Sequence, residues 1–368
     1  MKFSSSRENL LTPLQQVIGV IEKRQTLPVL SNVLIKLNGE RMEFTGTDLE
    51  VQLVTQSNAE FGDTEEGAIT VPARKLLDIC KQLPDRSTIN VECRQDKFSI
   101  QCARSRFSLA TLPADNYPEF ESGIPEVELM VPSRVLKRAM DKTLFAMALQ
   151  DVRYYLNGML LEVGGGFLRT VASDGHRLAI AQEAMESADF EPRQVILPRK
   201  GAMELYRLLS DQEDPLTLQI GSNTVRVLLE GFQFAAKLID GRYPDYQRVM
   251  PKDITRVATI DRDTLRAALT RVAILSNEKF RGVSLELEAN RMVLKAQNPE
   301  HEEAEDEVEI QLDGEPLEVG FNASYLLDAV SNVDSDEIRL SFSDTTHSCL
   351  VEDVENNRFQ FIVMPMRI

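Results

Sequence analysis

The sequence predicts an α+β protein built from three copies of one domain. Two observations predict this fold class: a repeat in which Asp48 and Asp174 are 174 − 48 = 126 residues apart, and the order strand, helix, strands, helix, strands within each copy. The 368-residue chain is also longer than one hydrophobic core usually supports. We expect each domain to contain two similar βαβββ half-units whose helices pack on one side of antiparallel sheet. The domain boundaries are placed at residues 1–125, 126–254 and 255–368.

The repeat is clearest in a hairpin-like segment of each copy. Residues 33–48 contain two runs with alternating apolar positions, joined by a turn and ending in an aspartate. Residues 159–174 have the same pattern, with three glycines at the turn. In residues 283–298 the pattern is weaker, and Asn298 takes the place of the aspartate. Such segments are typical of β-hairpins, and their recurrence decides the architecture more firmly than local propensity does.

The same spacing continues on both sides of each hairpin. Segments with a helical pattern align downstream, at residues 71–78, 197–204 and 321–328. Each copy closes with an aromatic strand and a proline, at residues 106–109 with Tyr117-Pro118, 231–234 with Tyr243-Pro244, and 358–361 with Met364-Pro365. Each copy opens with apolar residues at helical spacing: Leu10, Leu14, Val17, Ile18 and Ile21; Leu136, Met140, Leu144 and Met147; Leu265, Leu269 and Val272.

The composition limits the classes of function. With 43% apolar and 27% charged residues, and no apolar run near the roughly 20 residues of a membrane-spanning helix, the chain is expected to be a soluble globular protein. Its formal net charge of −17 should repel nucleic acid over the chain as a whole. A nucleic-acid function would therefore need a local basic surface, or a geometry in which tight phosphate contacts are not what retains the partner.

The N-terminus and the cysteines indicate a cytoplasmic protein without a metal site. The first residues reach Arg7-Glu8 without the apolar segment of a secretory signal. Four cysteines show no paired metal-ligand spacing, and the chain has three histidines. We expect reduced, mostly buried thiols, and neither a cofactor nor a metal.

Catalysis is not supported by any motif. Residues 173–177 (Ser-Asp-Gly-His-Arg) gather nucleophile, acid and base types, but neighbours along a chain point in different directions, whereas catalytic groups must converge. The glycines at 164–166 lack the lysine and the helix start of a phosphate loop, so a turn is expected there. Because Asp48 and Asp174 recur as repeat equivalents, they are interpreted as turn residues.

Longer motifs resemble one known family. They are Gly46-Thr47-Asp48-Leu49-Glu50, the stretches 150–158, 174–178 and 275–282, and the terminal Met364-Pro365-Met366-Arg367. Together they closely resemble the beta sliding clamps of bacterial DNA polymerase III, over essentially the whole chain. The resemblance implies a non-enzymatic homodimer: two three-domain chains form a head-to-tail ring around double-stranded DNA, with helices lining the hole and sheets facing outward. Such a ring tethers the replicative polymerase for processive synthesis.

That geometry reconciles an acidic chain with DNA as its partner, because encirclement retains the duplex without tight phosphate contacts. The predicted helix with Arg134, Lys137, Arg138 and Lys142 suits a DNA-facing wall, although without the resemblance an exposed polar helix face would be the favoured interpretation. By position in the family motifs, the expected DNA contacts are Arg24, Arg74, Gln150, Tyr154 and Tyr155. Either tyrosine could instead be structural.

The resemblance also implies a cleft that captures short peptides of the polymerase, the clamp loader and other proteins with a clamp-binding motif. Carried over by position, its residues are Leu156, Ser173, Gly175, His176, Arg177, Leu178, Pro244, Arg248, Val249, Tyr325, Ser348, Ile362, Met364, Pro365, Met366 and Arg367. Flexible methionines and rigid prolines suit such a groove, although Met364 and Met366 taken without the family motif would be interpreted as core residues. The chain departs from the family pattern at Ser173, where threonine is usual, and at Thr346 and Ile368.

A dimer interface is implied between the third domain of one chain and the first domain of its partner. The expected residues are Lys75, Arg104, Arg106, Phe107 and Leu109 on one side, and Ile274, Leu275, Glu300 and Glu303 on the other. Apolar residues at the centre should carry most of the affinity, and the charged rim should set register and association rate.

Two other classes of function remain as alternatives. An enzyme acting on DNA would need a carboxylate cluster or an activated nucleophile. A protein-interaction scaffold would need the peptide cleft alone, and it would not be retained on circular DNA.

Overall fold

The computed structural model describes residues 1–23, 27–94, 96–121 and 123–367. Arg24 and Ile368, which the sequence analysis singles out, therefore lie outside the described residues. The first repeat contains β1 (Lys2–Ser6), α1 (Arg7–Val17), β2 (Asn32–Asn38), β3 (Arg41–Thr47), β4 (Val51–Asn58), β5 (Phe61–Glu65), β6 (Gly67–Pro72), α2 (Ala73–Gln82), β7 (Thr88–Arg94), β8 (Lys97–Cys102), β9 (Ser105–Ala110) and β10 (Leu112–Pro113).

The second and third repeats follow the same order. The second contains β11 (Val127–Pro132), α3 (Ser133–Leu144), β12 (Gly158–Gly164), β13 (Phe167–Ser173), β14 (Arg177–Ala184), β15 (Arg193–Pro198), α4 (Arg199–Leu208), β16 (Pro215–Ile220), β17 (Thr224–Leu229), β18 (Phe232–Lys237) and the short 3-10 helix η5 (Tyr246–Val249). The third contains β19 (Arg256–Asp261), α5 (Arg262–Val272), β20 (Gly282–Glu288), β21 (Arg291–Gln297), β22 (Glu303–Glu309), β23 (Gln311–Asp313), β24 (Leu317–Asn322), α6 (Ala323–Ser331), β25 (Glu337–Phe342), β26 (Cys349–Asp353) and β27 (Phe359–Val363).

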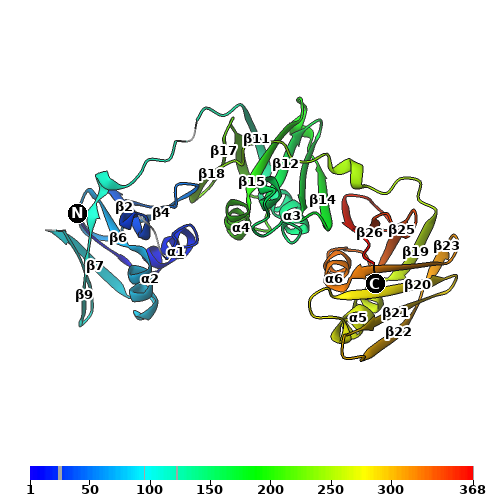
Figure 1. Ribbon diagram of the computed structural model, residues 1–368. Coiled ribbons are helices and arrows are strands. Elements are labelled where there is room, and N and C mark those ends of the chain that lie inside the picture. The colour runs from blue at the N-terminus through cyan, green and yellow to red at the C-terminus, as the bar shows by residue number, and fades with distance from the viewer. Residues whose placement is uncertain (24–26, 95, 122, 368) are drawn as a thin grey trace. The chain divides into compact units, whose positions relative to one another are not determined.

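These elements confirm the predicted α+β fold of repeated βαβββ half-units. In the first repeat the half-units are β1-α1-β2-β3-β4 and β6-α2-β7-β8-β9, with β5 and β10 as short additions. α1 packs on α2 and on the hairpin of β3 and β4, and α5 packs in the same way on α6 and on β21 and β22 (Figure 1). The helices thus bury one face of the sheets, as an apolar stripe at helical spacing requires.

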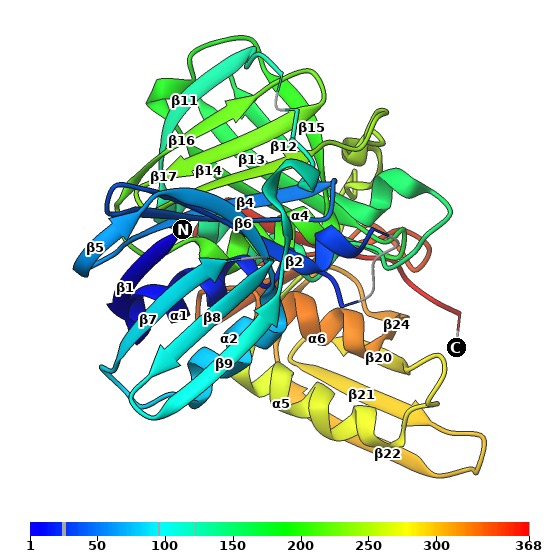
Figure 2. The ribbon, with the colours of Figure 1, turned by 90° about the vertical axis from the view of Figure 1, so that its left-hand side faces the viewer.

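The chain folds into two compact units, and the division passes through the second repeat. Unit 1 comprises Met1–Arg134 and Lys200–Leu238, and unit 2 comprises Val135–Arg199 and Ile239–Ile368. Unit 1 holds a five-stranded sheet, β5-β1-β7-β8-β9, whose last three strands lie side by side in Figure 2, and a nine-stranded sheet, β10-β6-β2-β3-β4-β18-β17-β16-β11. Unit 2 holds a nine-stranded sheet, β15-β12-β13-β14-β27-β26-β25-β19-β23, and a four-stranded sheet, β22-β21-β20-β24.

Each nine-stranded sheet joins two repeats through one antiparallel strand pair. In unit 1 the joining pair is β4 with β18, with Leu53 opposite Phe234. In unit 2 it is β14 with β27, with Ala179 opposite Phe361. The second repeat gives β11, β16, β17 and β18 to the sheet of unit 1 and β12, β13, β14 and β15 to the sheet of unit 2, which explains the course of the division. The three domain boundaries given above stay a prediction.

Local sequence accounts for the turns that shape each repeat. Gly164, Gly165 and Gly166 all have positive φ, at 125°, 61° and 82°, in the turn between β12 and β13, a backbone conformation that glycine adopts without steric cost. After the hairpins, the Asp48 carboxylate accepts backbone N–H bonds from Glu50 and Val51 at 2.9 and 2.7 Å. These bonds support the interpretation of the recurring aspartate as a turn residue.

Two details of the sequence interpretation are wrong. The first helix ends at Val17, so Ile18 and Ile21 follow it in tight turns in which Ile21 N–H donates to the Ile18 carbonyl at 3.3 Å. α3 ends at Leu144, before Met147. The spacing of apolar residues nevertheless indicates burial correctly, because Ile21 and Met147 are both buried. Apolar periodicity reports the side that faces the core, whereas helix ends are set by local hydrogen bonds.

The closing strands align differently from the sequence motif. Val91, Leu218 and Leu340 occupy equivalent positions in β7, β16 and β25, opposite Ile100, Val227 and Val351. Those three residues in turn lie opposite Phe107, Phe234 and Phe361. Phe107 is therefore the equivalent of Phe234 and Phe361. The aromatic motif instead aligns Phe107 with Phe232 and Phe359, two residues earlier in their strands. The hairpin of β8 and β9 has the same length as that of β17 and β18, with Cys102 opposite Ser105 and Leu229 opposite Phe232, so the aromatic residues differ in position within the strand itself.

Candidate functional site

The candidate site in unit 2 begins with an apolar patch on the nine-stranded sheet. Because β14 pairs directly with β27, Leu178 lies opposite Ile362, and side chains of two repeats meet. The patch comprises Leu160, Val171, Leu178, Ile180, Leu350 and Ile362, and Tyr243, Tyr246 and Met250 pack against it from the segment after β18. A buried apolar patch flanked by a chain segment and polar groups is the usual construction of a ligand groove.

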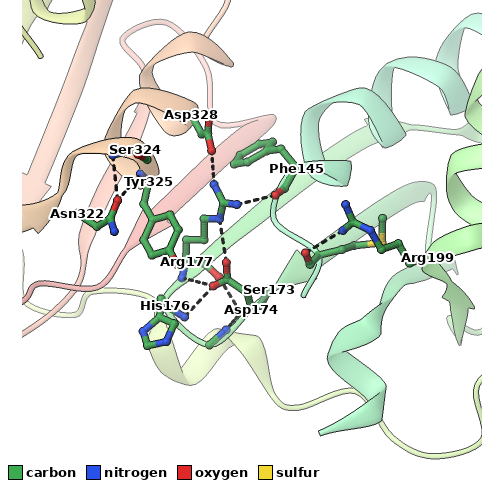
Figure 3. A network of polar contacts seen from close by, with 12 residues as sticks. Phe145, Ser173, Asp174, His176, Arg177, Arg199, Asn322, Ser324, Tyr325 and Asp328 are labelled. Atoms are coloured by element: carbon green, nitrogen blue, oxygen red, sulfur yellow. Dashed lines mark hydrogen bonds and ion pairs between the residues drawn. The ribbon is translucent and has the colours of Figure 1, made fainter. Parts of the chain in front are cut away.

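Arg177 holds the rim of this patch together (Figure 3). Its Nε donates to Asp174 Oδ2 at 3.0 Å, and its guanidinium also pairs with Asp328 of α6 and donates to the Phe145 carbonyl at 2.8 Å. The same guanidinium lies 4.6 Å from the Tyr325 ring centroid. With its donors engaged and its planar face on an aromatic ring, Arg177 is fixed in one orientation.

His176 and Ser173 serve the turn rather than a catalytic triad. The Ser173 hydroxyl donates to the Arg177 carbonyl at 2.7 Å and accepts from Gly175 N–H at 3.1 Å. His176 stacks on Tyr325 with the ring centroids 6.2 Å apart. Asp174 accepts backbone N–H bonds from His176 and Arg177 at 2.9 and 3.0 Å. The His176 ring thus presents a flat wall beside Tyr325, as Figure 3 shows.

The C-terminal segment crosses the other side of the patch. Met364 N–H donates to the His176 carbonyl at 2.9 Å, and Met366 N–H donates to the Gly320 carbonyl at 2.9 Å. Two hollows adjoin this region. One of about 430 Å³ is lined by Pro365, Met366 and Arg367 together with residues of β20 and β24. The other, of about 320 Å³, is lined by Leu160, Pro244 and the first turn of η5.

The structure brings the predicted cleft residues together in unit 2. Ser348 is buried, and its hydroxyl donates to the Val249 carbonyl at 2.7 Å, which ties the loop before β26 to η5. Exposed or half-buried members are Ser173, Gly175, His176, Arg177, Pro244, Arg248, Val249, Tyr325, Met364, Pro365, Met366 and Arg367, and buried members are Leu156, Leu178, Ser348 and Ile362. Their roles in binding stay a prediction.

A polar network beneath η5 was not predicted from the sequence. Glu162 of β12 lies opposite Arg169 of β13, and Arg169 Nη1 donates to Glu162 Oε2 at 2.8 Å and to the Tyr246 hydroxyl at 2.8 Å. Burial raises the pKa of Tyr246. A cross-strand pair of opposite charges in the predicted hairpin was the available signal, but nothing in the sequence placed Tyr246 above it.

The predicted DNA contacts that the structure describes fall in two places. In unit 1, Arg74 is exposed at the start of α2, and its guanidinium donates to the Ile21 carbonyl at 3.0 Å. In unit 2, Gln150 adopts a positive φ of 54°, and Tyr154 is 57% exposed and packs edge-on against Tyr155. This loop is braced by Asp151, whose pKa is lowered to about 2 by hydrogen bonds from Arg153.

The proposed DNA-facing wall on α3 is wrong for Lys142. Its side chain is 9% exposed, and its ammonium donates to the Asn332 carbonyl at 2.6 Å and to Asp334 Oδ1 at 2.5 Å. Arg138 also pairs with Asp334, at 2.8 Å, and Arg134 pairs with Glu213 at the surface. Lys142 thus fastens α3 to the loop after α6, because a lysine that is this deeply buried needs an acidic partner.

The predicted interface residues lie on and beside two strands at the ends of their sheets. β9 ends the five-stranded sheet of unit 1 and carries Arg106, Phe107 and Leu109, with Arg104 just before it. β22 ends the four-stranded sheet of unit 2 and begins at Glu303, after Glu300. Lys75 is exposed on α2, Leu275 is half-buried, and Ile274 is 75% exposed. Long edge strands with apolar side chains are open to pairing with another chain.

Three other features of the described residues bear on function. Cys80, Cys102 and Cys349 are buried and Cys93 is half-buried, all as free thiols. No group of three or more potential metal ligands occurs in residues 1–23, 27–94, 96–121 and 123–367. None of the helices in this part of the chain is long and apolar enough to cross a membrane.

Comparison with known proteins gives consistent matches over the whole chain. Family models of the N-terminal, central and C-terminal domains of the DNA polymerase III beta subunit match residues 1–121, 130–245 and 247–367. A beta sliding clamp of Vibrio cholerae is 48% identical over 368 residues, with 100% of both chains covered. The structure of the sliding clamp of Pseudomonas aeruginosa bound to griselimycin is similar with a TM-score of 0.97 and 48% identity, again over 100% of both chains.

Proposed function

This chain belongs to the DNA polymerase III beta subunit family, and we propose which of its surfaces perform that family's function. The function is that of a DNA sliding clamp: a dimeric ring encircles DNA and tethers the polymerase, with no catalytic step of its own. We assign its three clamp domains to residues 1–125, 126–254 and 255–368, and its place of action to the cytoplasm. Helices line the hole of the proposed ring, and sheets face outward.

The observation that carries the proposal is the pair of edge strands. Within the chain, each repeat passes to the next through equivalent strands, β4 with β18 and β14 with β27. The third repeat supplies β22 as the equivalent of β4 and β14, and the first repeat supplies β9 as the equivalent of β18 and β27. Both strands end their sheets. Pairing β22 of one copy with β9 of another therefore continues the same pattern, and two copies close the ring.

The pairings of β4 with β18 and of β14 with β27 also predict which residues lie opposite each other in the proposed pairing of β22 with β9. Phe234 lies opposite Leu53 and Phe361 lies opposite Ala179. The equivalent of Phe234 and Phe361 in β9 is Phe107. The equivalent of Leu53 and Ala179 in β22 is Ala304, because Ala304 lies opposite Ala296 as Ala179 lies opposite Ala172. Phe107 thus pairs with Ala304 of the second copy.

This register places opposite charges together. From the pair of Phe107 and Ala304, one residue forward on β9 corresponds to one residue back on β22, because the strands are antiparallel. Ser108 therefore lies opposite Glu303 of the second copy, Arg106 opposite Glu305 and Arg104 opposite Glu307. Glu303, Glu305 and Glu307 are all exposed in the single chain. Arg106 of β9 and Arg104 just before it, opposite acidic residues of β22, set the register and suppress the pairing of like edges.

Disulfide crosslinking tests the junction. Residues directly opposite in antiparallel strands have Cα atoms about 4.5–5.5 Å apart, within disulfide range. Ser108→Cys with Glu303→Cys should give a covalent dimer on mild oxidation. Ser108→Cys with Glu307→Cys, four residues out of register, is the matched control. Equal crosslinking of both variants, or of neither, would contradict the register.

The proposed DNA contacts are weak and exchangeable. Arg24, Arg74, Gln150, Tyr154 and Tyr155 are assigned to them. Two observations support the assignment: Arg74 is exposed, and Tyr154 projects from a loop that Asp151 and Arg153 hold rigid. A sliding ring needs contacts that break quickly, so a few cationic and aromatic side chains suit it better than a continuous basic surface.

The cleft of unit 2 is proposed to bind short peptides of the polymerase, the clamp loader and other proteins with a clamp-binding motif. Its apolar patch and the Arg177 network support this role, as does the griselimycin complex of the similar clamp from Pseudomonas aeruginosa. The methionines Met364 and Met366 adapt to varied apolar side chains at the rim. Isothermal titration of griselimycin into wild type and Leu178→Asp tests the site: binding should be lost in the variant, whereas unchanged binding would place the ligand elsewhere.

A further inference from the structure

Unit 1 contains a groove with the same construction as the cleft, which the function described above does not use. It lies over β2, β3 and β4 of the first repeat, and the segment from Ala114 to Phe120 crosses it. The hollow measures about 750 Å³. We call it the first-repeat groove, and its position on the sheet follows from the internal repeat.

The strand registers show that the groove and the cleft are equivalent. Leu34 lies opposite Thr45 in the first repeat, as Leu160 lies opposite Val171 in the second. Tyr117 and Tyr243, one period apart, each lie in the crossing segment, and burial raises the pKa of both. The Tyr117 hydroxyl donates to the Thr45 carbonyl at 3.0 Å and fixes the segment over the sheet. The groove is thus a built feature rather than a chance hollow.

The floor of the first-repeat groove is polar where the floor of the cleft is apolar. Among the residues that line the groove, Thr45 stands at the position of Val171 and Gln52 at the position of Leu178. Leu34 and Val54 retain an apolar character. A ligand chosen for the cleft by its apolar side chains would leave these polar groups without partners, at a cost in free energy. The groove therefore selects a different, more polar ligand.

The charges of the groove differ in the same way. In the cleft, Glu162 is neutralised by Arg169 and closed over by the Tyr246 hydroxyl. At the equivalent places the groove has Lys36, Glu43 and Phe120, which has no hydroxyl. Lys36 lies opposite Glu43 on the neighbouring strand, and among the described residues neither side chain forms a hydrogen bond or an ion pair.

Acidic side chains predominate around the hollow. Glu43, Asp115 and Glu119 line it together with one cation, Lys36, so the local formal charge is 1 − 3 = −2. Glu43 is half-buried, and Asp115 and Glu119 are exposed. Accessible carboxylates favour lysine and arginine side chains, and a charge-assisted hydrogen bond is stronger than a neutral one.

We propose that the first-repeat groove is a second docking site, which binds a basic linear segment of a partner protein. Lysine or arginine side chains of that segment pair with Glu43, Asp115 and Glu119, and the Thr45 and Gln52 side chains offer hydrogen bonds to its polar residues. The site requires neither the cleft nor the ring.

The test is binding of a defined basic peptide to the full-length protein. The probe is a dye-labelled heptapeptide, Gly-Lys-Ser-Arg-Ser-Lys-Gly, titrated by fluorescence anisotropy. The double variant Glu43→Gln with Glu119→Gln should bind the probe about tenfold more weakly than wild type. The matched control, Glu40→Gln with Glu230→Gln, removes the same charge from exposed positions of unit 1, and its affinity should equal that of wild type.

Three results would overturn the proposal. No saturable binding to wild type would remove the site. An equal loss in the control variant would assign the binding to the general negative charge of the chain. Displacement of the probe by griselimycin, at concentrations that occupy the cleft, would place the peptide in unit 2. All of the substitutions are at exposed or half-buried positions, so the variants should fold, as thermal unfolding would verify.

Discussion

Lys142→Ala tests whether α3 uses this lysine as a structural fastener. The substitution removes an ammonium that donates to the Asn332 carbonyl at 2.6 Å and to Asp334 at 2.5 Å. It also removes a cation 5.3 Å from the centroid of the Phe359 ring. Asp334 would keep its pair with Arg138, but the Asn332 carbonyl would lose its charged donor.

The magnitude follows from burial and partners. Hydrogen bonds to charged groups contribute about 1.5–3 kcal/mol, and breaking one partner of a fully buried ion pair costs about 3–5 kcal/mol. Asp334 is 45% exposed and retains Arg138, so the upper range does not apply. We expect Lys142→Ala to lower the free energy of unfolding by about 2 kcal/mol and the Tm by about 4–8 °C.

Thermal unfolding followed by circular dichroism measures this loss. Arg134→Ala on the same helix is the control, because its pair with Glu213 is more than half exposed on both sides and should contribute less than about 1 kcal/mol. At temperatures where both variants are folded, Lys142→Ala should load onto DNA as wild type does. Equal Tm values for Lys142→Ala and wild type, together with weaker retention on DNA, would refute the structural role and restore the DNA-facing one.

The same pair predicts a dependence on pH. Burial of Asp334 by itself would raise its pKa, but hydrogen bonds from Lys142 and Arg138 outweigh burial, so the pKa lies below the ordinary value of 3.8. Stability from the ionised carboxylate is therefore complete above the unfolded-state pKa and is lost as pH falls through the folded-state pKa. The difference in unfolding free energy between wild type and Asp334→Asn should be constant near neutrality and shrink below about pH 4. A difference that widens with acid would reverse the assigned sign.

Two further predictions concern the ring and the cleft. Ile274→Ala with Leu275→Ala should give monomers in sedimentation analysis, because an apolar centre carries most of an interface's affinity; a persistent dimer would reject these residues. Arg177→Ala should weaken griselimycin binding at least about tenfold in calorimetry, and an unchanged Kd would show that the rim network is dispensable.

The sequence predicted the repeated fold because each half-unit depends on local patterns. Apolar alternation, glycines at turns and the aspartates that close them act within a few residues of one another. Asp174, for example, accepts backbone N–H bonds from His176 and Arg177. Such contacts recur with the repeat, so one copy predicts the next. The order of strands and helices within each half-unit followed directly.

Contacts between distant parts of the chain could not be predicted in this way. Lys142 and Asp334 are 192 residues apart, and a basic residue on a predicted helix looks the same whether it faces solvent or a neighbouring repeat. Tyr246 meets Arg169 from a connecting segment without a periodic pattern. The shift of Phe107 relative to the aromatic motif could not be predicted, because a motif aligns residue types whereas backbone pairing aligns positions.

The cleft could be assigned from the sequence through the family motifs alone. In isolation, Leu178 and Ile362 look like ordinary core residues, and they come together because β14 pairs with β27. Pairing between strands of different repeats is a tertiary property that no local signal in either strand specifies. For the same reason, the polar first-repeat groove could not be predicted from the sequence. It is recognised when the strand registers of the first and second repeats are compared.

The most direct test of the account is retention of the protein on nicked circular DNA, after loading by a cognate clamp loader with ATP, before and after the circle is linearised. The protein should be retained on the circle and rapidly lost from the linear form, because a closed ring is held by topology rather than by tight contacts. Retention that is equal on both forms would mean ordinary surface binding. Absence from both, with the loader active on a control clamp, would contradict encirclement and leave a protein-docking scaffold.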